Sequence, residues 1–276
     1  MLFYRIHLFE KITDINLLTQ GSAHFSFTNC YVEVFKDEDI FDNIKIKRIR
    51  SDHSCKFFIL ELRAFNYTDI SITHTDIKNL CLKKAPHNTN DVYANISFIN
   101  TTIANIDIAE KIKFHSSIFF RQCTFTRENL YENLTSKCNF KNLEFHSSTI
   151  FEKCVFNICP NFLDTTFSRD TLFTGCIFND VSSQKSEQSY RYLKNRMIDL
   201  SYDTMAHEFH ALELEVRHNN FTYNGTRAIP IKKWFTTEDG LEIIGLYILK
   251  HISHFGRNLW RPLVILFCIF VIGADT

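Results

Sequence analysis

Residues 114–125 read FHSSIFFRQCTF, and residues 145–156 read FHSSTIFEKCVF. The two segments agree in their first four residues and in the Phe-x-x-Cys-x-Phe motif that closes each of them. An echo of this length is improbable by chance, and internal repeats are the signature of folds built from stacked units. The pair of segments therefore predicts a repeat fold.

The repeat has a period of five residues. Counting in fives from Phe120, six of seven positions are large and apolar, and the seven are Phe120, Phe125, Leu130, Thr135, Phe140, Phe145 and Ile150. A helix places apolar residues three and four apart and a strand places them two apart, so a period of five indicates neither. It indicates a square coil with five residues on each face, whose turns stack about 4.8 Å apart as parallel strands.

Cysteine recurs two residues before the periodic Phe. The full motif occurs at Phe120–Phe125, Phe151–Phe156 and Phe173–Phe178. We expect both positions to point into the coil, with room for only a small side chain at the Cys position. Doubled apolar pairs at Phe119-Phe120, Ile150-Phe151 and Leu172-Phe173 advance the phase by one residue. The predicted inward residues are Phe114, Phe120, Cys123, Phe125, Cys138, Phe140, Phe145, Phe151, Cys154, Phe156, Phe167, Phe173, Cys176 and Phe178.

These motifs resemble the pentapeptide-repeat family, in particular its bacterial branch with Phe and Cys at the inward positions. The resemblance implies a mainly β fold, a right-handed quadrilateral parallel β-helix over residues 25–181 that is regular from about residue 98. Residues 1–24 would form an N-terminal cap.

A change of periodicity follows the coil. Apolar residues from Tyr190 to Val216 have helical spacing, which predicts a pair of helices within residues 182–218. The pair resembles the helix-turn-helix of membrane-attached pentapeptide-repeat proteins, which begins aromatic-Arg-x-Leu-Lys and ends Ala-x-x-Phe-x-x-x-Glu. The residues that match are Tyr190, Arg191, Leu193, Lys194, Ala206, Phe209 and Glu213.

The remaining residues suggest attachment to a membrane. Residues 219–258 read as a linker and an amphipathic helix with Leu241, Ile244, Ile248 and Ile252 on one face. Residues 259–276 form a hydrophobic segment in which Trp260, Arg261 and Pro262 resemble the Arg-Pro-led span of the same group. Its 13 uninterrupted apolar residues fall short of the roughly 20 that cross a bilayer core, so it inserts shallowly, is incomplete, or is instead a buried helix. The basic residues before it predict a cytoplasmic coil.

Composition limits the chemistry. Formal net charge is zero, so no overall basic field favours nucleic acid. The chain has nine cysteines and no CxxC pair, and its first residues lack the apolar run of a signal peptide. We therefore expect reduced thiols in the cytosol. We interpret the coil cysteines as packing residues in preference to a zinc or redox array.

Two other sets of residues resemble functional sites but have simpler interpretations. His207, His210 and Glu213 stand at three-residue steps and could converge on a metal, but their spacing is not HExxH. His115 and His146 follow inward Phe residues and should face outward. No phosphate-binding loop or nucleophile elbow is present. No catalytic, cofactor or metal site is therefore predicted.

The resulting functional hypothesis is a non-enzymatic scaffold at the bacterial inner membrane, whose cytoplasmic coil binds a protein partner. One alternative is the cytosolic regulatory part of an ion channel. A less favoured one is a mimic of DNA that protects a topoisomerase, a role that calls for an acidic outer face and not a charge-balanced chain.

Overall fold

The structure is a computed structural model that describes the backbone of residues 15–18, 22–28, 31–36, 45–52, 55–62, 69–83, 90–109, 111–126, 137–182, 184–224, 245–250 and 264. The side chains it describes begin at residue 51 and leave out residues 52, 58 and 221–224. The chain divides into two compact units, Met1–Asn179 and Asp180–Thr276. The described strands belong to the first unit and the described helices to the second.

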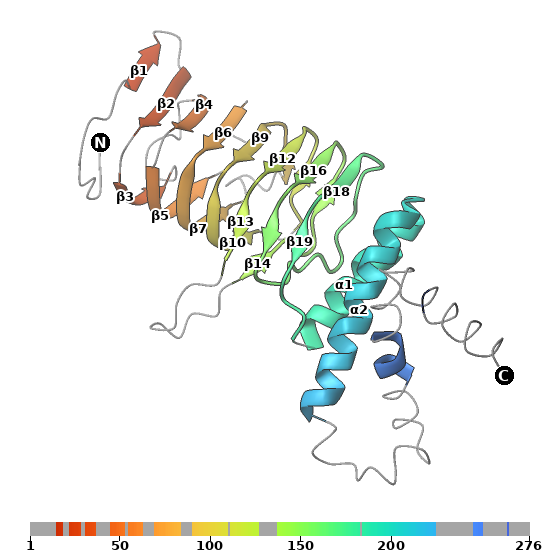
Figure 1. Cartoon of the computed structure of the whole chain (residues 1–276). Helices are drawn as coiled ribbons and strands as arrows, with labels where there is room; N and C mark the ends of the chain where they lie inside the picture. The colour runs from red at the N-terminus through yellow and green to blue at the C-terminus, as the bar shows by residue number, and fades with distance from the viewer. Residues whose placement is uncertain are drawn as a thin grey trace, which may run out of the picture. The chain divides into compact units, whose positions relative to one another are not determined.

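The first unit is a parallel β-solenoid (Figure 1). Its first sheet runs in the order β1 (Ile15–Leu18), β2 (Ser22–Thr28), β4 (Lys45–Asp52), β6 (Asp69–Thr73), β9 (Asn95–Ile99), β12 (Ile118–Arg121), β16 (Thr149–Glu152) and β18 (Thr171–Thr174). The β1 and β2 strands pair antiparallel, and every later neighbour in this sheet is parallel. The prediction of a mainly β, parallel coil is confirmed.

Two more sheets complete the solenoid. The second contains β3 (Tyr31–Lys36), β5 (Cys55–Leu62), β7 (Thr75–Leu82), β10 (Thr102–Ile108), β13 (Thr124–Phe125), β17 (Val155–Phe156) and β19 (Ile177–Phe178), and β14 (Cys138–Asn139) pairs with β10. The third contains β8 (Asp91–Val92), β11 (Lys113–Phe114) and β15 (Glu144–Phe145). Because parallel neighbours come from successive turns, equivalent residues of each turn lie in columns.

Stacked aromatic rings fill the interior. Phe98, Phe120, Phe151 and Phe173 form one column with ring centroids 5.1, 5.0 and 4.9 Å apart. Three further columns are Phe125–Phe156–Phe178, Phe114–Phe145–Phe167 and Phe140–Phe162. Rings of different columns meet edge to face, the geometry that complements stacking. Burial of each Phe contributes about 1.5–3 kcal/mol, so these columns supply much of the driving force for folding.

The corners explain where the period of five holds. One corner column, formed by His74, Asn100, Gln122, Lys153 and Gly175, has φ between 50° and 63° at every level, and a second is formed by Lys111, Asn142 and Asp164. Across such a left-handed corner the inward residues are five apart, as in Phe151 and Phe156. At the other corners they are six apart, as in Phe145 and Phe151, because without the left-handed residue the chain needs one more residue to turn.

A turn without insertion therefore contains 22 residues, as the pairing of Phe151 with Phe173 shows. Counting in fives from Phe120 therefore reaches Ile150 where the chain takes a step of six, at the doubled pair Ile150-Phe151. Ile150 is half-buried, whereas Phe151 is fully buried. Leu130 and Thr135, which also belonged to that count, lie outside the described residues.

Aliphatic residues continue the columns upstream of Phe98. Ile72 pairs with Phe98, and Ile77 pairs with Ile103. Where aliphatic turns meet aromatic ones, a cavity of about 10 Å³ remains, lined by residues that include Ile106, Ile108 and Phe140. The lining is entirely apolar, so the cavity offers a water molecule no hydrogen-bond partner.

Two helices begin the second unit, α1 (Gln184–Asp199) and α2 (Asp203–Asn224). They pack against each other, and their buried apolar residues include Tyr190, Leu193, Met197, Ala206, Phe209, Leu212 and Val216. Residues 245–250 are also helical, and Leu246 packs with Ala211 and Leu214 of α2. Ile248, which was expected on the apolar face, is 48% exposed, while Leu241, Ile244 and Ile252 lie outside the described residues.

Candidate functional site

An apolar row lies on the outer surface of the first sheet. Side chains alternate along a strand, so the residue before each inward Phe points outward. Phe119, Ile150 and Leu172 are in register across β12, β16 and β18, and each is half-buried. We call these three residues the outer apolar row. In each doubled apolar pair, such as Ile150-Phe151, the first residue belongs to this row and the second lies in the core.

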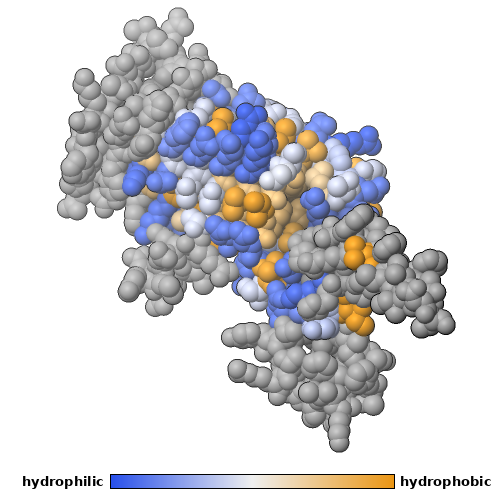
Figure 2. All heavy atoms as spheres, in the orientation of Figure 1, coloured by the Kyte–Doolittle hydropathy of each residue, from blue (hydrophilic) through white to orange (hydrophobic). Residues whose placement is uncertain are grey.

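An ion pair borders this row. Arg121 donates from Nε to Oε2 of Glu152 at 2.8 Å, and its guanidinium lies 4.8 Å from the centre of the Phe119 ring. Figure 2 shows hydrophilic and hydrophobic side chains interleaved over the visible face of the coil. An apolar strip with a charged border is the composition of many protein–protein interfaces.

A second outward feature is a stack of rings on the third sheet. Tyr93, His115 and His146 lie with ring centroids 4.8 Å apart at each step. Nε2 of His115 is 2.8 Å from Oδ1 of Asp91, and Nε2 of His146 is 3.2 Å from Oε2 of Glu144. The two imidazoles face outward as expected. The bond between His115 and Asp91 joins successive turns, whereas the bond between His146 and Glu144 lies within one turn.

Inside the coil, Cys123, Cys154 and Cys176 form what we call the thiol column. Their Sγ atoms donate to carbonyl oxygens of the preceding turn, those of Phe98, Phe120 and Phe151, at 3.3, 3.4 and 3.2 Å. Thr101 occupies the equivalent position one turn earlier, and its hydroxyl donates to the Ile72 carbonyl at 3.4 Å. The position thus requires a small hydrogen-bond donor.

Burial changes the acidity of these thiols. The hydrogen bond with Cys154, together with burial, raises the pKa of Cys123. Burial, followed by the nearby Cys159 and Cys154, raises the pKa of Cys138. Interaction with the thiols of Cys123 and Cys176 lowers the pKa of Cys154, which lies between them. The pKa values of the adjacent thiols Cys123 and Cys154 are therefore displaced in opposite directions.

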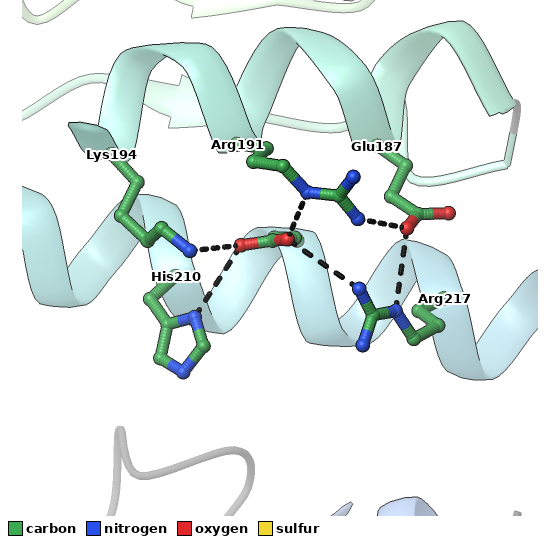
Figure 3. Close-up of polar contacts among 6 residues, drawn as sticks. Glu187, Arg191, Lys194, His210 and Arg217 are labelled. Atoms are coloured by element: carbon green, nitrogen blue, oxygen red, sulfur yellow. Dashed lines mark hydrogen bonds and ion pairs between the residues drawn. The ribbon is translucent and has the colours of Figure 1, made fainter. Parts of the chain in front are cut away.

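A buried carboxylate joins the two helices. Glu213 of α2 is 3% exposed, and its oxygens accept hydrogen bonds from Arg191 Nε and Lys194 Nζ of α1, both at 2.7 Å. Figure 3 shows Glu187, Arg191 and Lys194 of α1 facing His210 and Arg217 of α2. Glu187 accepts from both arginines, at 2.7 and 3.3 Å. The resemblance had matched Arg191, Lys194 and Glu213, and the structure brings these three together.

The cations determine the charge state of Glu213. Burial alone would raise the pKa of its carboxyl, but hydrogen bonds from Lys194 and Arg191 outweigh burial and bring the pKa below its ordinary value. In the same way, the hydrogen bond to Glu213 raises the pKa of Arg191. Glu213 is therefore ionised at neutral pH, and α1 and α2 are joined by complementary charge as well as by apolar packing.

The same contacts bear on the metal candidate of residues 207–213. Nδ1 of His210 is 3.5 Å from Oε2 of Glu213, but both carboxylate oxygens already accept from cationic donors. Among the described residues, no three His, Cys, Asp or Glu side chains are arranged to hold a metal ion.

Twelve of the fourteen predicted inward residues of the coil are buried. The two others, Cys176 and Phe178, are half-buried and belong to the last turn. In the helical pair, Tyr190, Leu193, Ala206, Phe209 and Glu213 are all buried. Trp260, Arg261 and Pro262 lie outside the described residues. Within the ranges that the structure describes, no helix is both long and apolar enough to cross a membrane.

Sequence reasoning missed several residues. Phe162 is fully buried in the Phe140 column but follows Phe156 by six residues, and Pro160 takes the position that Cys holds elsewhere. In the helices, the roles of Glu187 and Arg217 were missed, although Glu187–Arg191 and Glu213–Arg217 have the four-residue spacing of helical ion pairs.

Comparisons with known proteins add no relative. No family model matches the chain, and neither the curated proteins nor the solved structures give a match. The likeness to pentapeptide-repeat proteins therefore rests on the motifs of this chain and on its parallel β-solenoid.

Proposed function

We propose that this protein is a non-enzymatic scaffold of the bacterial pentapeptide-repeat type, attached to the inner membrane through its C-terminal residues. Its right-handed coil lies on the cytoplasmic side and binds a protein partner. The observation that carries the proposal is the outer apolar row of Phe119, Ile150 and Leu172, presented in register on a rigid surface.

The energetics of the row support contact with a protein. A half-buried apolar side chain gains about 25 cal/mol for each Å² that a partner removes from water. The row is held in place from beneath by the column of Phe120, Phe151 and Phe173, so a partner need not order the surface before binding. Arg121 and Glu152 at its border favour a partner of matching charge pattern.

The charge distribution also bears on the alternative of DNA mimicry. A mimic of the phosphate backbone presents unpaired acidic side chains along its surface. Here Glu152 is paired with Arg121 and Glu144 with Lys113, at 2.8 and 3.3 Å. These outward rows are therefore charge-balanced, which favours a protein partner.

Membrane attachment is tested by fractionation of the full chain from bacterial cells lysed without detergent. We expect the protein in the membrane pellet and resistant to carbonate extraction. The matched variant Leu266→Asp adds a charge that costs roughly 2.5–3.5 kcal/mol in a membrane helix, and should move the protein to the supernatant. Recovery of the unaltered chain in the soluble fraction would disprove the attachment.

The partner surface is tested by affinity purification from those membranes. Ile150→Asp places a charge in the outer apolar row and should remove the proteins that co-purify with the unaltered chain. Asp170→Asn, on the same face but outside the row, should leave them in place. Equal recovery with all three chains would show that the row does not bind the partner.

A further inference from the structure

The last turn of the solenoid exposes one end of the thiol column. Cys123 and Cys154 are fully buried, whereas Cys176 is half-buried. The three thiols are equivalent residues of successive turns, because the strands that follow them pair in register, Thr124 with Val155 and Val155 with Ile177. A reagent in solvent therefore meets Cys176 before the other two.

The spacing of the turns places Cys154 and Cys176 within bonding range of each other. Adjacent strands lie about 4.8 Å apart, and disulfides form between Cα atoms about 4.4–6.8 Å apart. Both thiols point inward from the same side, and each donates to a carbonyl of the turn before it. In-register side chains stand nearly one strand spacing apart, more than the roughly 3.8 Å between Cβ atoms of a relaxed disulfide. A bond here would be strained, and strained disulfides are readily reduced.

The chemical environment suits the two thiols to different roles. Cys154 lies between the thiols of Cys123 and Cys176, and its interaction with them lowers its pKa, which favours a nucleophilic thiolate. Cys176 has the accessibility that the first reaction requires. By contrast, Cys159 is not aligned with Cys138, because Asn139 pairs with Asn161 and so places Pro160 beside Cys138.

We propose that Cys176 and Cys154 form a reversible disulfide in response to hydroperoxides. The Cys176 thiolate attacks the peroxide, the O–O bond breaks, and Cys176 becomes a sulfenic acid while the alcohol or water leaves. The Cys154 thiolate then attacks the Cys176 sulfur, the S–O bond breaks, and hydroxide leaves as water after protonation. The two thiols together lose two electrons, which reduce the peroxide. A low-molecular-weight thiol restores both cysteines.

The bond would tie the last turn to the turn before it. The last turn has a neighbouring turn of the coil on one side only, so it is the turn that gains most from a covalent link. Cys123 would remain reduced, because it is two turns from Cys176 and the turn that carries Cys154 lies between them.

The test is a peptide map of the reduced full chain after treatment with hydrogen peroxide and alkylation of the remaining thiols. We expect a peptide pair linked through Cys154 and Cys176 that disappears on treatment with a thiol. The variants Cys176→Ser and Cys154→Ser should lower its yield at least tenfold, and Cys123→Ser should not. In Cys154→Ser, Cys176 should accumulate sulfenic acid that a dimedone probe captures.

Serine is a suitable replacement because hydroxyl donors already fill this position in earlier turns. Thr75 donates to the Thr73 carbonyl at 2.8 Å, and Thr101 donates to the Ile99 carbonyl at 3.1 Å. Circular dichroism that matches the unaltered chain will establish that each variant folds. Complete recovery of alkylated Cys154 and Cys176 after peroxide, or a link between Cys123 and Cys154 instead, would overturn the proposal.

Discussion

The coil and the helical pair are stabilised by opposite means. In the coil the interior is apolar, and the donors that enter it are thiols and hydroxyls bonded to carbonyl groups. In the helical pair a buried carboxylate, Glu213, is held by cations of the other helix. Stacked rings do not change with pH, whereas a buried charge does. The two units should therefore unfold under different conditions.

The largest expected effect comes from the aromatic columns. Phe156 is fully buried between Phe125 and Phe178, so Phe156→Ala should destabilise the protein by about 3–5 kcal/mol. Cys154→Ala, two residues away, removes one small side chain and should cost about 1 kcal/mol. Urea unfolding of both variants measures the difference, and a larger loss for Cys154→Ala would contradict the assigned phase of the repeat.

That phase shows how far the sequence determines the coil. The Phe-x-x-Cys-x-Phe motif marks one of the two columns of left-handed corners, where five residues separate two inward rings. The six-residue corners have no motif common to all of them. His-Ser-Ser follows both Phe114 and Phe145, whereas Phe156 is followed by a different sequence that includes Ile158-Cys159-Pro160. Phe162 was missed for this reason. The outer apolar row was visible as doubled residues, but only the pairing of strands showed that its members lie side by side.

The helical pair was less accessible to sequence reasoning. Its apolar positions follow from helical periodicity, yet periodicity does not indicate which charged residues cross from one helix to the other. Arg191, Lys194 and Glu213 stood out only through a family resemblance. The distance of 22 residues between Arg191 and Glu213 has no local signature, because it depends on the turn at residues 200–202.

Removal of the buried charge should have the next largest effect. Glu213→Gln keeps the shape of the side chain and deprives Arg191 and Lys194 of their shared partner. We expect a loss of about 2 kcal/mol, below the 3–5 of a fully buried pair because Arg191 is partly exposed. Glu187→Gln should cost under about 1 kcal/mol, since its pairs lie nearer the surface. Thermal unfolding followed by helical circular dichroism distinguishes them, and equal losses would argue against a special role for Glu213.

Acid should destabilise the helical pair before it destabilises the coil. The pKa of Glu213 lies below its ordinary value of 4.5 in the folded chain, so its contribution is complete above that value and is lost as pH falls through the folded pKa. Hydrogen exchange between pH 6 and pH 2.5 should show protection of residues 184–220 falling before that of residues 95–179. In Glu213→Gln the two regions should lose protection at more similar pH values. Loss of protection in the coil before the helical pair would contradict the prediction.

The smallest expected effect concerns the corners. Lys153 adopts a φ of 53°, which costs an L-residue roughly 1–2 kcal/mol, so Lys153→Gly should stabilise the coil by about 0.5–1 kcal/mol. Gly175→Ala, in the same corner column, should have the opposite sign. Its new Cβ would lie 3.6 Å from Lys153 Cγ, an ordinary contact, so conformation alone would cause the loss. Urea midpoints check both, and a destabilised Lys153→Gly would show that its side chain contributes more than its backbone costs.

Because segments of different length fit at a corner, the number of residues in a turn does not determine the register of the core. Phe120 and Phe151 are 31 residues apart in sequence and Phe151 and Phe173 are 22 apart, yet the ring centroids are 5.0 and 4.9 Å apart. Nine additional residues between Phe125 and Phe140 leave the columns undisturbed. Segments of different length could therefore be exchanged at this corner during evolution, or grafted there by design, while the stack of rings beneath stays the same.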